Sequence, residues 1–177
     1  MRTQDDGVCH LHTRQKLVQH TTNVKVLQFF AILFVALGLA PGAAHVLELP
    51  QKMQYDAQLY MAVTSTLYRM FGIAGAVIQM GSFVLLVILC WCVRRRPAFR
   101  WTLLATLAIV LSLLLWTALV APVNAQWGEV LRTNSSAAPA LYIQLRPRWE
   151  YGHVAAFVAW LAGFMLLIVG TLRERPA

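Results

Sequence analysis

The sequence has 177 residues, of which 59% are hydrophobic and only 12% are charged. A soluble domain carries roughly a quarter charged residues, so this composition excludes an ordinary soluble fold. The formal net charge of +8 would suit a nucleic-acid partner, but the chain has no basic groove lined by stacking side chains, so no nucleic acid is expected.

A polar segment, residues 1–23, precedes the apolar part of the chain. This segment supplies no apolar face to bury, so it predicts a disordered tail. Its Cys9, His10, His12 and His20 would also suit a metal ion, because clustered histidine and cysteine side chains are good ligands. The disordered tail is the form we expect.

Four apolar runs follow the tail. Each is long enough to supply the roughly 20 helical residues that cross a hydrocarbon core about 30 Å thick. The runs are continuously apolar rather than alternating, which excludes a membrane β-barrel. We therefore predict an all-α integral membrane four-helix bundle over residues 24–172, followed by a short tail at 173–177. The predicted spans are 24–48, 69–93, 101–123 and 151–172.

The first span carries two glycines, Gly38 and Gly42, on the helical face that also holds His45. Small residues four positions apart let a neighbouring helix approach closely. Pro41 removes a backbone donor and predicts a kink, and Pro50 predicts the end of the helix.

The second span follows Gln51–Leu67, a segment that we predict as a loop or as a helix lying on the membrane surface. Gly72 and Gly75 near the start of the span predict close packing within the bundle. Gln79 lies deeper in the apolar run, so we expect its amide to hydrogen-bond a neighbouring helix rather than face lipid.

The third span ends near Asn124, where Trp116 and Trp127 share one helical face. A segment rich in small and polar residues, 134–139, then predicts a flexible loop. The fourth span is expected to begin around Trp149.

The positive charges predict the orientation of the bundle. Ten of the 15 lysines and arginines fall on one side of the four spans, and the positive-inside rule places that side in the cytoplasm. Both termini are then cytoplasmic, and we expect the plasma (inner) membrane. The ten residues are Arg2, Arg14, Lys16, Lys25, Arg94, Arg95, Arg96, Arg100, Arg173 and Arg175.

Polar and aromatic residues are concentrated at the opposite, outer end of the predicted bundle. The first and third spans end there and the second and fourth begin there, so residues far apart in sequence converge. His45 and His153 stand out because ionisable side chains within apolar spans usually serve a function. The converging residues are His45, Glu48, Tyr68, Arg69, Asn124, Trp127, Trp149, Glu150 and His153.

Two histidine–glutamate pairs at this end invite a metal hypothesis. His45 and Glu48 are three residues apart, as are Glu150 and His153, and facing helices that present such pairs can form a metal site. Two imidazoles and two carboxylates would suit a transition metal. The alternative is structural: the aromatic residues form an interfacial belt, and Arg69 and Arg148 pair with the two glutamates.

Four short motifs carry a resemblance to a known family. The chain resembles, over roughly Leu27–Thr171, the four-helix integral membrane family that includes the fungal anthrone oxygenases. This domain has no assigned function in most bacterial members. The motifs are GAAHVLELP at residues 42–50, YRMFG at 68–72, PVNAQW at 122–127 and RWEYGH at 148–153.

The resemblance implies a membrane oxidoreductase, because anthrone oxygenases oxidise polycyclic phenols with molecular oxygen and no obvious cofactor. We expect a flat, lipophilic phenol or quinol that enters from the bilayer. His45 or His153 would act as the general base, and Asn124 and Arg69 would stabilise the resulting oxyanion. The residues expected to bind the ring are Tyr68, Trp116, Trp127 and Trp149.

The sequence leaves two alternatives open. One is a metal-dependent redox protein that uses His45, Glu48, Glu150 and His153 as ligands. The other is a non-enzymatic membrane subunit or scaffold, in which the glycine faces of the first two spans bind partner helices.

Overall fold

The structure is a computed structural model that describes residues 3–173, with side chains described for residue 19 and residues 22–173. Within this range the chain is helical and contains no strand. The elements are α1 (Thr3–Lys52), α2 (Ala57–Thr66), α3 (Tyr68–Val93), α4 (Phe99–Leu119), α5 (Ala121–Thr133), the 3-10 helix η1 (Ser135–Ala137) and α6 (Ala138–Leu172).

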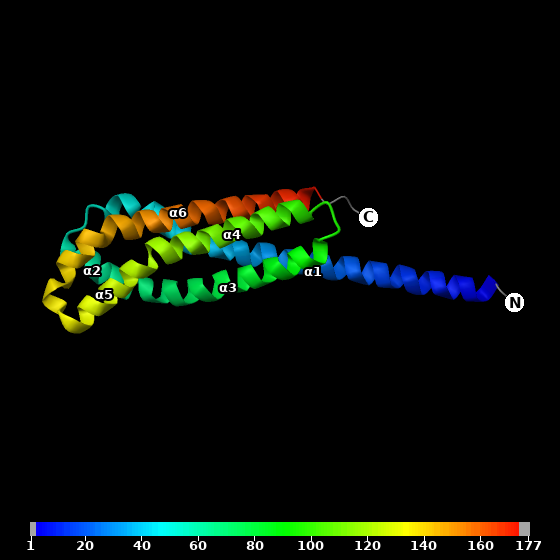
Figure 1. Cartoon of the computed structure of the whole chain (residues 1–177), viewed down its shortest axis with the longest axis horizontal. Helices are drawn as coiled ribbons and strands as arrows, with labels where there is room; N and C mark the ends of the chain where they lie inside the picture. The colour runs from blue at the N-terminus through cyan, green and yellow to red at the C-terminus, as the bar shows by residue number, and fades with distance from the viewer. Residues whose placement is uncertain (1–2, 174–177) are drawn as a thin grey trace.

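Four helical stretches are long and apolar enough to cross a membrane, which confirms the prediction of a helical membrane bundle. They cover Thr22–Lys52, Tyr68–Val93, Phe99–Thr133 and Ser135–Leu172. Large apolar side chains such as Val77 and Trp91 are about two-thirds exposed on the outer surface of α3, as expected for helices surrounded by lipid. The start of α1 and the end of α6 lie at the same end of the bundle (Figure 1).

The helices extend further than the hydropathy predicts. Helix α1 continues past Pro50 to Lys52, α5 carries the third span on to Thr133, and α6 begins at Ala138 rather than near Trp149. A proline near a helix end loses only one backbone hydrogen bond and is favoured in the first turn, where it stands in α5 and α6. The polar ends therefore remain helical outside the apolar runs.

The segment between the first two spans contains a helix, α2. A loop and a helix were the two predicted alternatives for this segment. Asp56 caps it, because the carboxylate Oδ1 accepts a hydrogen bond from the Leu59 amide at 2.8 Å. Helix α2 packs against α6 and α3 at the end of the bundle away from the start of α1 (Figure 1).

The amino-terminal segment differs from the expected disordered tail, because α1 is helical from Thr3 onward and projects beyond the bundle (Figure 1). No proline interrupts residues 3–23, and adding a residue to an existing helix is far easier than starting a new one. The side chains of Cys9, His10, His12 and His20 lie outside the described residues, so the metal alternative for this segment stays a prediction.

Close packing at the first pair of glycines is confirmed, and α6 is the partner helix. A Cβ atom added at Gly38 would lie 2.4 Å from Cζ2 of Trp160, and one at Gly42 would lie 2.7 Å from Cδ2 of Phe157. The Trp160 indole also donates to the carbonyl of Val35 at 2.8 Å. These glycines are therefore covered within the chain and offer no surface to a partner helix.

Helix α6 lies at the centre of the bundle and packs against α1, α2, α4 and α5. Helix α3 packs mainly against α1, and its packing against α4 is much sparser. A pocket lies between α3, α4 and α6 near the α2–α5 end.

Candidate functional site

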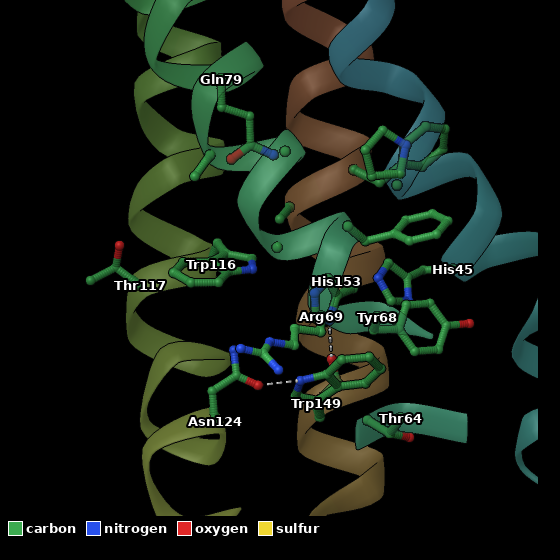
Figure 2. Close-up of a pocket in the computed structure, with 18 of the residues that line it drawn as sticks. His45, Thr64, Tyr68, Arg69, Gln79, Trp116, Thr117, Asn124, Trp149 and His153 are labelled. Atoms are coloured by element: carbon green, nitrogen blue, oxygen red, sulfur yellow. Dashed lines mark hydrogen bonds between the residues drawn. The ribbon is translucent and has the colours of Figure 1, made fainter. Parts of the chain in front are cut away.

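A pocket of about 600 Å³ lies within the bundle, between α1, α3, α4, α5 and α6 (Figure 2). Its volume falls in the range of small-molecule sites, and most of its lining is apolar. All the predicted catalytic and ring-binding residues line this one pocket: His45, Tyr68, Arg69, Trp116, Asn124, Trp127, Trp149 and His153.

Three residues of α3 that were expected to contact a neighbouring helix line the pocket instead: Gly72, Gly75 and Gln79. A Cβ atom added at Gly72 or Gly75 would meet nothing within 4 Å, so the predicted close packing at these glycines is wrong. Gln79, expected to bond a neighbouring helix, lines the pocket as well. The two glycines leave space for a ligand rather than for another helix.

The two glutamates do not pair with the arginines proposed for them. Their shared partner is Lys52, whose ammonium lies 2.9 Å from Oε2 of Glu150 and 3.7 Å from Oε2 of Glu48. The Lys52 side chain is only 2% exposed and Glu150 is fully buried. Arg148 instead donates to the carbonyl of Ala118.

The same ammonium bears on the metal hypothesis. Lys52 Nζ lies 3.2 Å from Nδ1 of His45, so it stands among the groups proposed as ligands. In the described part of the chain, no three or more side chains of histidine, cysteine, aspartate or glutamate are grouped so as to hold a metal ion. His45, Glu48 and Glu150 thus meet around a lysine, and the predicted metal site stays a prediction.

Two tyrosines also donate hydrogen bonds to the glutamates. The Tyr60 hydroxyl donates to Oε1 of Glu150 at 3.1 Å, and the Tyr68 hydroxyl donates to Glu48. Burial raises the pKa of Tyr60, and the negative charge of Glu150 raises it further. Tyr60 therefore remains a hydrogen-bond donor, and both oxygens of the buried Glu150 carboxylate are satisfied.

Hydrogen bonds indicate which nitrogen of each pocket imidazole carries the proton. The Lys52 ammonium can only donate, so Nδ1 of His45 accepts, and the ring proton of a neutral His45 is on Nε2. His153 Nδ1 lies 2.9 Å from the carbonyl of Trp149, which can only accept, so Nδ1 of His153 carries a proton and Nε2 is left as an acceptor. The two ring centroids are 4.0 Å apart.

The orientation of the Asn124 amide is set by a tryptophan. The Trp149 indole donates to Oδ1 of Asn124 at 2.8 Å, as the dashed line in Figure 2 marks. The amide oxygen is therefore the acceptor, and the NH₂ group remains available to a ligand. Arg69, from the start of α3, is exposed and lines the same pocket.

Flat aromatic walls surround these polar groups. The rings of His45 and Tyr68 stack at 4.8 Å with an interplanar angle of 20°, and Trp149 meets the His153 ring at 4.2 Å. Farther toward the α2–α5 end, Trp127 stacks on Tyr142 at 4.2 Å. Such walls suit a flat aromatic ligand.

Lys52 and Tyr60 are the important residues that the sequence analysis misses. Lys52 follows Glu48 by four positions and His45 by seven, a spacing that places all three on one helical face. The signal was present, but it depended on the helix continuing beyond Pro50. No local pattern in the sequence indicates that Tyr60 of α2 contacts Glu150 of α6.

Comparisons with protein-family models, with curated proteins and with solved structures find no match to this chain.

Proposed function

We propose that this protein is a membrane-embedded oxidoreductase that oxidises a flat, lipophilic phenol, quinol or anthrone with molecular oxygen. The observation that carries the proposal is the complementary pair of imidazoles in one aromatic pocket. His153 offers an unprotonated Nε2, and His45 offers an Nε2–H donor, beside the free amide NH₂ of Asn124. The pocket thus offers one base and several hydrogen-bond donors to a flat ring. This combination suits removal of a proton from a substrate whose negative charge then develops on an oxygen atom.

The chemistry is clearest for an anthrone. Nε2 of His153 accepts a proton from the ring methylene, and the electron pair of that C–H bond delocalises onto the ring oxygen. The Asn124 amide, the Arg69 guanidinium and the His45 N–H stabilise this oxyanion. Molecular oxygen is the oxidant: one of its atoms becomes the new carbonyl and the other leaves as water, so the anthrone becomes an anthraquinone.

Lys52 acts as a positioning residue in this proposal. Its ammonium donates to Nδ1 of His45 and thereby favours the tautomer with the proton on Nε2. Burial against Glu150 fixes the ammonium, since both side chains are almost fully excluded from solvent. The donor group of His45 is therefore set before a substrate binds.

The proposed orientation places the pocket near the outer face of the plasma membrane. By sequence, ten of the 15 lysines and arginines fall on the opposite side of the spans, including the turn between α3 and α4 with Arg94, Arg95 and Arg96. The positive-inside rule then assigns that end, and both termini, to the cytoplasm.

Oxygen uptake by the purified protein in detergent tests the proposal, with an anthrone as substrate. The matched variants are His153→Gln, which removes the base, and His20→Gln, which changes a histidine that precedes the first span. We expect uptake by the wild type and by His20→Gln, with stoichiometric anthraquinone, and none above background by His153→Gln.

Uptake that persists in His153→Gln would overturn the assignment of the base. Binding of the anthrone without oxygen uptake by any form would remove the oxygenase function and leave a ligand-binding membrane protein. A scaffold function has less support, since Gly38 and Gly42 are covered by α6 and Gly72 and Gly75 face the pocket.

A further inference from the structure

The pocket is long and narrow. Its lining runs along α6 from Tyr142 to Trp160, which at 1.5 Å per residue corresponds to about 27 Å of helix. A volume of about 600 Å³ spread over such a length makes a channel rather than a rounded chamber. A ring held between His45 and His153 would therefore occupy only part of it.

The two parts of this channel differ in chemistry. The part near the α2–α5 end holds the imidazoles, the Asn124 amide and the Arg69 guanidinium. The deeper part is lined mainly by apolar side chains, among them Met80, Leu113, Phe157 and Trp160. Its polar members are Gln79 and Ser112, and the Ser112 hydroxyl already donates to the carbonyl of Ala156 at 2.7 Å.

An opening runs along the wall of the bundle between α3 and α4. On α3 the pocket is bordered by exposed residues from Arg69 through Gly72 and Ala76 to Met80, whose side chain is 54% exposed. Exposed Thr117 borders it on α4. The eleven steps from Arg69 to Met80 correspond to about 16 Å of helix, roughly half of a hydrocarbon core about 30 Å thick. The opening therefore faces lipid tails as well as the membrane surface.

We propose that the pocket takes a head-and-tail ligand from the bilayer, through the opening between α3 and α4. The ligand has an oxidisable aromatic ring, which binds between the two histidines, and a long hydrocarbon chain, which lies in the deeper apolar channel beside Gly75 and Leu113. The identity of the ring rests on the proposed function, whereas the placement of the chain rests on the channel and its opening.

Photolabelling in reconstituted vesicles tests this placement. The probe is a hydroquinone with a ten-carbon chain that carries a diazirine at mid-chain, and adducts are mapped by peptide mass spectrometry. We expect adducts in residues 75–80 of α3 and 112–117 of α4, removed by an excess of the same hydroquinone without the diazirine.

Matched variants separate channel binding from contact with bulk lipid. Gly75→Leu fills the channel at a position where an added Cβ meets nothing within 4 Å, so it is expected to fold, and Ala76→Leu narrows the opening one residue further on. Each should reduce the specific adducts at least fivefold. Val77→Leu, at a lipid-facing position 67% exposed and outside the pocket lining, should leave them unchanged.

Three results would overturn the proposal: adducts confined to lipid-facing residues such as Val77, adducts insensitive to both Gly75→Leu and Ala76→Leu, or removal of the adducts by phospholipid alone. The last result would assign the channel to a membrane lipid. The assay records binding without turnover, so specific labelling by a protein that consumes no oxygen would contradict the proposed function and support the channel.

Discussion

The ammonium of Lys52 and the Nδ1 atom of His45 lie 3.2 Å apart, two turns from each other on one helix. The contact joins a residue of the pocket to a buried ion pair behind it, because the same ammonium binds Glu150 at 2.9 Å. The ion pair and the pocket are therefore parts of one hydrogen-bonded arrangement, and variants of Lys52 should affect both.

Lys52→Met should destabilise the fold strongly. It leaves the fully buried Glu150 carboxylate without its cation, and breaking one side of a buried ion pair costs about 3–5 kcal/mol. The free energy of unfolding in mixed detergent micelles measures the loss. The double variant Lys52→Met, Glu150→Met should recover most of it, because two apolar side chains then replace the pair. Equal stability of the single and double variants would contradict this view of the pair.

Gly38→Ala should reduce stability, while Gly72→Ala should not. The added methyl group at Gly38 would collide with the Trp160 ring at 2.4 Å, and overpacking of this kind costs typically about 1–3 kcal/mol. At Gly72 the same methyl group meets nothing within 4 Å. Thermal unfolding of the two variants in one detergent compares them directly, and equal midpoints would show that the α1–α6 contact is less tight than described.

His153→Gln and His45→Gln should differ in their effect on turnover. Loss of a general base slows the reaction by about 10²–10⁴-fold, which we expect for His153→Gln. A glutamine at position 45 can accept from Lys52 and still donate an N–H, so we expect a loss of less than about tenfold. Steady-state anthraquinone formation measures both, and a larger loss in His45→Gln would exchange the roles of the two histidines.

Trp149→Phe should act through Asn124. Without the indole N–H, which binds Oδ1 of Asn124 at 2.8 Å, the amide is free to rotate, and kcat should fall roughly tenfold or more. Asn124→Ala should lower kcat in the wild-type background but add little to Trp149→Phe, because both changes remove one interaction. Trp91→Phe, at an exposed position on α3, is the control. Additive losses would show that the two residues act independently.

The spans and the convergence of the pocket residues could be predicted, because both follow from local properties. Continuous apolar runs define the spans, and the alternation of direction between them brings His45, Asn124 and His153 to one end. The helix ends could not be predicted in this way. Polar residues outside the apolar runs, such as those at the start of α6, have the composition of a loop although the structure keeps them helical.

The role of the glycines, helix packing or pocket lining, could not be predicted from the sequence either. Gly38 and Gly72 each begin a pair of closely spaced glycines in an apolar run, yet one faces the Trp160 ring and the other faces an open pocket. The difference lies in what the opposite helix presents at that level. Neither the spacing nor the composition of α1 or α3 contains that information.

The Lys52–Glu150 pair also has a consequence for the order of assembly in the membrane. The two residues are 98 positions apart, so the lysine is synthesised well before its partner in α6. Until α6 is inserted, burial of the Lys52 ammonium would leave it without that partner, and the end of α1 is expected to stay near the headgroups. The bundle then closes when the last span arrives, and a chain truncated before α6 would leave Lys52 with Glu48 of the same helix in place of its buried partner.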